Sequence, residues 1–294
     1  MLHLHFLRGL RRSLVSTTAL SACLLALSCH GQSSTQSQAA STHIDSTTLR
    51  GDTLELIFAG DIMTHGPQIR AAAQADGSYD FAQSFGLVRP AIERADLAIG
   101  NLETTFGGKP YSGYPMFSSP EALAVALREA GFDILTTSNN HSCDRRGYGI
   151  THTIDVLDSL GIATTGSYRN LSERPARTPL IQSVRGIKLA ILAYTYGTNG
   201  LPIPHPTVID TISKEHIAAD LRRADSLGAE YKIVQIHWGN EYEKSPNRAQ
   251  RELAQWLADQ GVDAVIGSHP HVVQESTRLQ GQDTQRGETF VIYS

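Results

Sequence analysis

Short apolar runs alternate with helical patterns from residue 52 onward. Large apolar residues recur at the i, i+4 and i+7 spacing of an amphipathic helix over residues 150–160, 217–224 and 249–257. We expect Gly161 and Gly261 to end two of these helices, because glycine readily adopts the left-handed conformation beyond a helix end. The alternation predicts an α/β domain with a largely parallel sheet. The runs that predict strands are 54–59, 96–99, 133–137, 231–236 and 262–266.

Polar side chains follow each of the five predicted strands. In α/β folds, ligands bind beyond the carboxyl ends of the strands, so these side chains should converge. Carboxylate and amide oxygens mixed with imidazoles suit a divalent cation such as Mn, Zn, Fe or Mg. The set is large enough to hold one or two such ions. Its members are Asp61, Glu103, Asn140, His141, His237, His269 and His271.

Single members of this set also have purely structural interpretations. Asp61 is typical of a turn or helix cap, and Asn140 could complete a left-handed turn with the asparagine before it. His237 could be a core-facing imidazole with one satisfied nitrogen. His269 and His271 would lie on one side of an extended segment, because side chains alternate along a strand. The coincidence of all five polar strand ends favours a shared site.

Composition excludes several classes of protein. Apolar residues make up 40% of the 294 residues and charged residues 18%, which is enough apolar material for a core and excludes a disordered chain. The net charge of −4 argues against a nucleic-acid partner, which would attract a basic protein. Three cysteines cannot form a disulfide framework, and we expect Cys143 to be a small buried residue.

The N-terminal segment has the pattern of an export signal. Three arginines precede an apolar run over 13–28, so we predict a signal peptide over 1–28. The run is shorter than the roughly 20 apolar residues that a membrane-spanning helix needs. A small residue before Cys29 resembles a bacterial lipobox, which predicts lipidation of Cys29 and a lipoprotein anchored to a membrane of the cell envelope. The alternative is ordinary signal-peptidase cleavage beside an incidental cysteine.

A flexible tether should follow the signal. Residues 29–50 are rich in Ser, Thr and Gln, and such a segment buries too little apolar surface to offset its ordering entropy. We therefore place the folded domain at 51–294. The chain stops inside a predicted strand at 290–294, and the domain is expected to be truncated at its C-terminus.

Five motifs in sequence order carry a resemblance to a known family. Together they resemble the bacterial capsule-synthesis CapA family, which belongs to the calcineurin-like metallophosphatase superfamily. The resemblance implies a four-layer α/β/β/α metallophosphatase-like sandwich and a link to poly-γ-glutamate capsule synthesis or export. The motifs are GDIM at 60–63, GNLE at 100–103, SNNHSCD at 138–144, HWGNEY at 237–242 and GSHPHV at 267–272.

The resemblance also implies roles for individual residues. His141 matches the group that protonates the leaving oxygen. Asp144 and Glu241 are additional carboxylates that could complete the coordination or bind substrate; Asp144 could equally cap the helix that starts near Gly147. Met63 stands where the superfamily has a histidine, which removes one ligand from the first metal position. The residues that match metal ligands are Asp61, Glu103, Asn140, His237, His269 and His271.

The leading functional hypothesis is a surface-tethered protein of capsule synthesis with a metal-dependent, phosphoesterase-like hydrolase site. Its substrate would be a phosphoester or an anionic envelope polymer. The alternative is a non-catalytic assembly or export factor that binds the anionic polymer through the metal. A third hypothesis is a structural envelope lipoprotein with a relic site. In the family, membrane-embedded capsule-synthase components are the partners that the resemblance implies.

Overall fold

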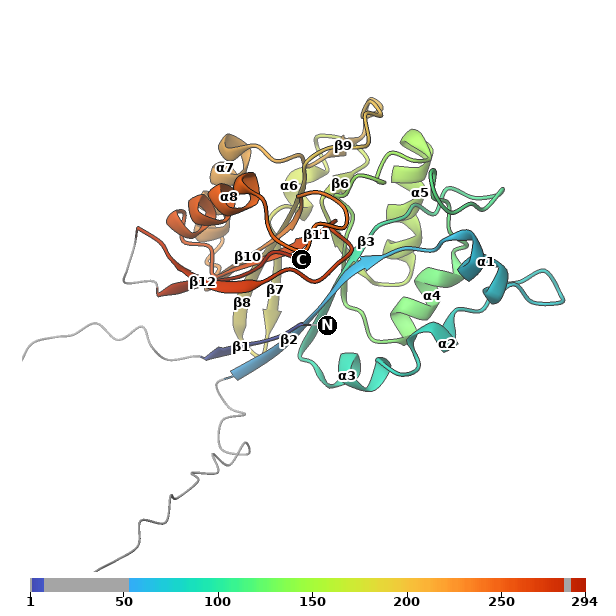
Figure 1. Ribbon diagram of the computed structural model, residues 1–294, viewed down its shortest axis with the longest axis horizontal. Coiled ribbons are helices and arrows are strands. Elements are labelled where there is room, and N and C mark those ends of the chain that lie inside the picture. Colours follow the sequence, from blue (N-terminus) through green and yellow to red (C-terminus); the bar gives the residue numbers. More distant parts are fainter. Residues whose placement is uncertain (1, 8–52, 283–286) are drawn as a thin grey trace, which may run out of the picture. The chain divides into compact units, whose positions relative to one another are not determined.

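The computed structural model describes residues 2–7, 53–282 and 287–294 (Figure 1). Leu54–Ser294 belong to one compact unit. Most of the predicted signal peptide, the predicted tether and Cys29 lie outside the described residues. The strand β1 falls within the predicted signal peptide and joins the edge of the first sheet. Within the described residues, no helix combines the length and the apolar character needed to cross a membrane.

The first sheet contains five strands in the order of the sequence. Strands β2 to β5 are parallel, as the alternation of strands and helices predicts. The expectation that the second predicted strand stops at Gly100 is wrong, because β3 continues to Leu102. The small size of Gly100 leaves room for Ile62, whose Cδ1 atom would lie 2.6 Å from a Cβ at this position and would have to move. The strands are β1 (Leu2–Leu7), β2 (Thr53–Ile62), β3 (Leu97–Leu102), β4 (Ile134–Thr136) and β5 (Ala163–Thr165).

The second sheet has six strands, of which the central four are parallel and the two edge strands antiparallel. A separate two-stranded sheet pairs β6 (Ser167–Tyr168) with β9 (Val208–Ile209). The six strands, in spatial order, are β12 (Ser276–Gln280), β13 (Glu288–Ile292), β11 (Ala264–Ser268), β10 (Tyr231–His237), β8 (Ile187–Thr195) and β7 (Leu180–Val184).

Eight helices lie among the described residues, and the longer ones cover the outer faces of the sheets. Figure 1 shows α4 and α5 on the side of the first sheet and α7 and α8 on the side of the second. The three long helices confirm the predicted periodicity. The helices are α1 (Gly66–Ala72), α2 (Ala82–Phe85), α3 (Arg89–Arg94), α4 (Ala122–Glu129), α5 (Arg146–Ser159), α6 (Arg174–Arg177), α7 (Lys214–Ser226) and α8 (Arg248–Asp259).

Local sequence signals explain where these helices begin and end. Asn247 caps α8 and forms a capping box with Gln250, which satisfies two backbone N–H groups at the helix start. Gly161 and Gly261 follow α5 and α8 with φ values of 68° and 72°, so both predicted helix ends are confirmed. Ser213 caps α7 by accepting a hydrogen bond from the backbone N–H of His216.

Burial on both faces makes the strands the inner layers of the domain. In β8, Leu192 and Tyr194 pack with α7 and α8, whereas the alternate residues Leu189 and Ile191 are also fully buried. In β3, Ala98 packs toward the helices of the first sheet. The two sheets therefore stack between two helical layers, as the expected α/β/β/α order requires.

Candidate metal centre

The strands of both sheets bring their carboxyl ends to one place. Asp61 lies near the end of β2, and Glu103 follows β3 directly. His237 is the last residue of β10. The remaining predicted ligands and the predicted acid follow β4 and β11, so residues spread over 210 positions of sequence meet in one cluster. They are Asn140, His141, His269 and His271.

Glu103 lies at the centre of this cluster without a hydrogen-bond partner. Its side chain is 0% exposed, and neither carboxylate oxygen is hydrogen-bonded within the described residues. The Nε2 atoms of His237 and His271 lie 3.7 and 3.8 Å from its Oε1 atom. Burial, followed by the charge of Asp61, raises the pKa of Glu103 to about 11. A bound cation would supply the missing partner for both oxygens.

Asp61 is held in the ionised form by several donors. Burial raises its pKa, but the hydrogen bond from His271 and the proximity of His237 outweigh burial and hold the pKa well below the usual value. Nδ2 of Asn101 donates to Oδ1 at 2.8 Å, and Nδ1 of His271 donates to Oδ2 at 2.8 Å. The backbone N–H of His269 donates to Oδ2 at 3.1 Å. These contacts fix the orientation of the carboxylate.

His237 is buried and uncharged. Its Nε2 donates to Oδ1 of Asn140 at 2.9 Å, and its Nδ1 accepts from the hydroxyl of Ser268 at 3.0 Å. The idea of a core imidazole with one satisfied nitrogen is therefore wrong, because both nitrogens have partners. Burial lowers the pKa of His237 to about 3. The neutral imidazole is the form that binds metal ions.

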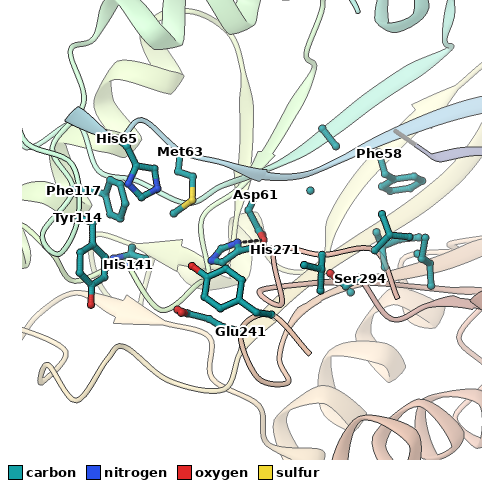
Figure 2. A pocket seen from close by; sticks show the side chains of 18 residues that line it. Phe58, Asp61, Met63, His65, Tyr114, Phe117, His141, Glu241, His271 and Ser294 are labelled. Atoms are coloured by element: carbon teal, nitrogen blue, oxygen red, sulfur yellow. Dashed lines mark hydrogen bonds and ion pairs between the residues drawn. The ribbon is translucent and has the colours of Figure 1, made fainter. Parts of the chain in front are cut away.

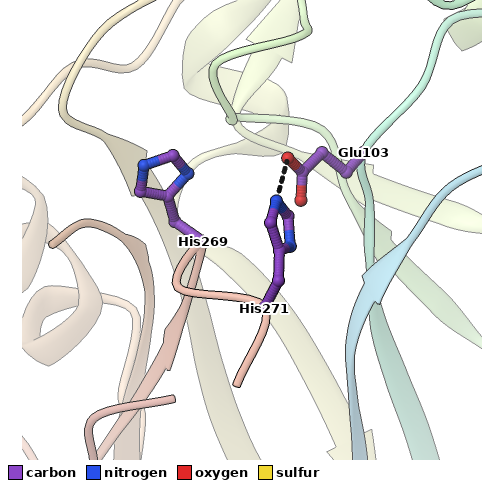
Figure 3. A group of neighbouring side chains, drawn as sticks. All are labelled: Glu103, His269 and His271. Carbon is purple, nitrogen blue, oxygen red and sulfur yellow. Dashed lines mark ion pairs between the residues drawn. The ribbon is translucent and has the colours of Figure 1, made fainter. Parts of the chain in front are cut away.

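The turn after β11 gives His269 and His271 a conformation that residues other than glycine rarely adopt. Their φ values are 98° and 56°, so the predicted extended segment is wrong here. Such backbone strain is concentrated at functional sites. Nδ1 of His269 is buried and has no hydrogen-bond partner in the part of the chain that the structure describes. Figure 3 shows both imidazoles beside Glu103.

Two groups of potential ligands share one residue. Asp61, Glu103 and His237 form one group, and Glu103, His269 and His271 form the other. In each group the candidate ligand atoms lie within 4.8 Å of one another. Glu103 belongs to both groups, and neither of its oxygens is hydrogen-bonded within the described residues, so it would be a ligand common to both groups. The donor set of oxygens and imidazoles fits a divalent ion.

His141 and Asp144 form a pair beside this cluster. Nδ1 of His141 donates to Oδ2 of Asp144 at 2.7 Å, and the same oxygen accepts from the backbone N–H of Phe117 at 2.6 Å. The alternative that Asp144 caps α5 is wrong, since Arg145 occupies the N-cap without a side-chain hydrogen bond. Asn140 does not have the positive φ of a left-handed turn either. With its Nδ1 held, His141 has Nε2 available for proton exchange.

A cavity of about 600 Å³ opens next to the cluster. Asp61, His141 and His271 line it together with Glu241 and Met63, as Figure 2 shows. Such a cavity has the size of a small-molecule site. Met63, two positions beyond Asp61, therefore lines the cavity. Its thioether is a weak ligand for hard cations.

Sequence reasoning missed several side chains of the centre. Asn101 donates a hydrogen bond to Asp61, and Ser268 donates one to His237. Both residues lie inside the motifs on which the resemblance rests. Each is a polar residue in a mostly apolar strand, and this pattern could have indicated them. Tyr196 lies 4.8 Å from the ring of His269, and no local pattern indicated it. Cys143 is buried as expected, and burial raises its thiol pKa to about 11.

Comparisons with known proteins agree with the motifs. Residues 55–294 match the model of the family described as bacterial capsule synthesis protein PGA_cap. The chain is 27% identical over 238 residues to the capsule biosynthesis protein CapA of Bacillus anthracis, covering 75% of this chain and 55% of that one. It is 28% identical to the PGA biosynthesis protein CapA of Bacillus subtilis, covering 77% of this chain and 60% of that one. This chain thus spans only part of the relatives' length.

Among solved structures, the NAD nucleotidase of Haemophilus influenzae is similar, with a TM-score of 0.47 and 15% identity. The similarity covers 72% of this chain and 38% of that one.

Proposed function

Because the chain belongs to the family of bacterial capsule synthesis proteins, we propose that it is a metal-dependent hydrolase acting in the synthesis of an anionic capsule polymer. The observation that carries the proposal is the buried carboxylate of Glu103, whose two oxygens have no partner within the described residues. Burying a carboxylate without hydrogen bonds costs much free energy, and a cation bound at Glu103 would offset that cost.

The residues of the cluster divide the work of hydrolysis. One or two divalent ions would be held by Asp61, Glu103, Asn140, His237, His269 and His271. When bound, such ions lower the pKa of water and polarise the bond that is attacked. His141 protonates the leaving group, because it lines the cavity and Asp144 holds its other nitrogen. The target bond is a phosphoester or a bond of the capsule polymer.

Metal content and turnover test this function together. The purified protein should contain a divalent metal by elemental analysis and should hydrolyse an aryl phosphate in the presence of Mn²⁺. His141→Ala should lower turnover by about 10²–10⁴-fold and retain the metal, since the imidazole acts as an acid. His152→Ala is the matched control, because His152 contacts Glu121 away from the cluster. A wild-type protein without bound metal would contradict the proposal.

Met63 favours a second candidate function. It lines the cavity at the position where the superfamily resemblance expects an imidazole, and a site with one ligand fewer would catalyse poorly. The protein would then be a non-catalytic assembly or export factor that binds the anionic polymer through its metal. Metal binding without turnover of aryl phosphates or γ-glutamyl substrates would favour this candidate.

Export and anchoring complete the proposal. The arginines and apolar run before Cys29 support an envelope lipoprotein that would hold the domain near membrane components of capsule synthesis. Cells that express the chain should incorporate a fatty acid label into it, and Cys29→Ser should abolish the label. Labelling that persists in this variant would reject the anchor.

A further inference from the structure

Two exposed tyrosines border the cavity from different parts of the chain. Tyr114 is 73% exposed and lies in the loop between β3 and α4, whereas Tyr242 is 70% exposed and lies in the loop between β10 and α8. Both line the cavity, and Tyr242 lies 6.1 Å from the ring of His271. Exposed aromatic rings gathered around a cavity are typical of a binding surface.

Hydrogen bonds hold the loop that carries Tyr242. The backbone N–H of Tyr242 donates to the carbonyl of Pro270 at 2.8 Å, which ties this loop to the turn that carries the histidines. The side chain of Gln274 donates to the carbonyl of Glu243 at 2.7 Å. Because the backbone is held, the side chain of Glu241 is presented to the cavity from a set position.

Close packing sets the position of the other loop. Ser112 and Ser118 pair through two backbone hydrogen bonds of 3.0 and 2.8 Å. At the tip, a Cβ on Gly113 would lie 2.6 Å from the backbone nitrogen of Gly66, so only glycine allows this approach. Tyr114 follows immediately, so the loop places its side chain along the same cavity.

The charge of the cavity is acidic. Asp61 and Glu241 line it, and none of its described lining residues is lysine or arginine. Figure 2 shows Glu241 on the same side as Tyr114 and His141, away from Phe58. The carboxylates of a polyanion would therefore find no lysine or arginine among the described lining residues, whereas a cation would find the carboxylate of Glu241 and two aromatic side chains.

We propose that this part of the cavity binds the ammonium group of the substrate, with Glu241 as its counter-ion and Tyr114 and Tyr242 as aromatic walls. Carboxylates bind ammonium groups through charge-assisted hydrogen bonds, and tyrosine faces attract cations. The inference rests on the proposed function, because the metal cluster would take the acyl or carboxylate part of the same molecule. The substrate class is therefore the amino-terminal end of a peptide-like chain.

Calorimetric titration with a dipeptide and its acetylated form tests this subsite. The full chain, loaded with Mn²⁺, should bind γ-glutamylglutamate about tenfold more tightly than N-acetyl-γ-glutamylglutamate, because acetylation removes the ammonium charge. In Glu241→Gln this preference should fall to about twofold or less, while the affinity for the acetylated form and the metal content stay unchanged. Tyr242→Ala should weaken binding of the free amine by roughly threefold.

Glu243→Gln is the matched control, since Glu243 lies in the same loop but hydrogen-bonds Asn240 instead of lining the cavity. It should keep the wild-type preference. Equal binding of both dipeptides by the wild type would overturn the proposal, as would no binding of the free amine up to about 10 mM. A protein that prefers the free amine but binds no metal would instead reject the hydrolase and leave the ammonium subsite standing.

Discussion

Two buried acidic clusters of this domain differ in how their carboxylates are satisfied. In the first, Arg174 donates to Asp210 at 2.6 Å and to both oxygens of Asp220 at 3.1 and 2.5 Å. Tyr168 and Tyr194 donate to the remaining acceptor positions at 2.6 and 2.8 Å. Every carboxylate oxygen of this cluster has a donor.

The metal cluster shows the opposite arrangement. Asp61 is well supplied with donors, but within the described residues neither oxygen of Glu103 is hydrogen-bonded, and neither is Nδ1 of His269. Nearly all buried polar groups in proteins are hydrogen-bonded, so a satisfied acidic cluster needs only a structural explanation. The comparison therefore separates a cluster whose own contacts account for its burial from a cluster that leaves buried polar atoms without hydrogen bonds within the described residues.

The largest expected effect comes from removing the single cation of the satisfied cluster. Arg174→Met would leave two buried carboxylates uncompensated, which should lower the free energy of unfolding by about 3–5 kcal/mol. Urea denaturation measures this change. The metal content per folded molecule should stay the same, because Arg174 contacts no residue of the metal cluster within the described structure.

Arg248→Met provides the control for this variant. Arg248 pairs with Glu252 one turn along α8 and its side chain is exposed, so its loss should change stability little. An Arg174 variant as stable as this control would remove the distinction between the two clusters.

The second prediction concerns Glu103→Gln. In metal-free protein this change should alter the free energy of unfolding by less than about 1 kcal/mol, because the raised pKa already keeps Glu103 protonated. Metal at 100 times its Kd should stabilise the wild type by about 2.7 kcal/mol. The variant should lose most of that gain, as thermal unfolding with and without Mn²⁺ would show. Equal stabilisation of both proteins would mean that Glu103 does not bind the metal.

The sequence predicted the cluster around Glu103 better than it predicted the cluster around Arg174. Strand ends are visible as apolar runs followed by polar residues, and parallel strands must bring those ends together. Arg174 is separated from Asp210 by 36 positions and from Asp220 by 46. No periodicity connects them, because an ion pair depends on how loops and helices pack, not on one element.

The details that the sequence did not predict are also contacts across elements. Asn101 was expected beyond a strand that in fact continues through it, and the turn after β11 was expected to be extended. The left-handed φ of His269 and His271 follows from the contact of this turn with Asp61, which lies on the other sheet. Local propensity disfavours that conformation, so the tertiary contacts determine it.

Asn101 gives a third and smaller test. Asn101→Leu removes one of the donors that orient Asp61 and should weaken metal binding by about 10–100-fold, as the loss of a partner of a metal ligand does. Titration with a competing metal chelator measures this affinity. Asn170→Ala is the control, because the hydrogen bonds of the Asn170 side chain among the described residues lie within its own turn, to Ser172 and Glu173. Similar affinities in the two variants would indicate that Asp61 is not a ligand.

The smallest expected effect is the change in metal affinity per pH unit. Burial and the charge of Asp61 raise the pKa of Glu103 to about 11, so the folded, metal-free protein keeps this proton at neutral pH. In the metal-free protein, the contribution of Glu103 to the free energy of unfolding is fully present below the ordinary carboxyl pKa. This contribution is lost as the pH rises toward the raised pKa of Glu103. Since a cation must displace the proton, metal affinity should rise with pH by about tenfold per unit, and calorimetry in buffers of different ionisation enthalpy should detect its release. Affinity independent of pH between 6 and 8 would instead place the ion on groups that release no proton when it binds.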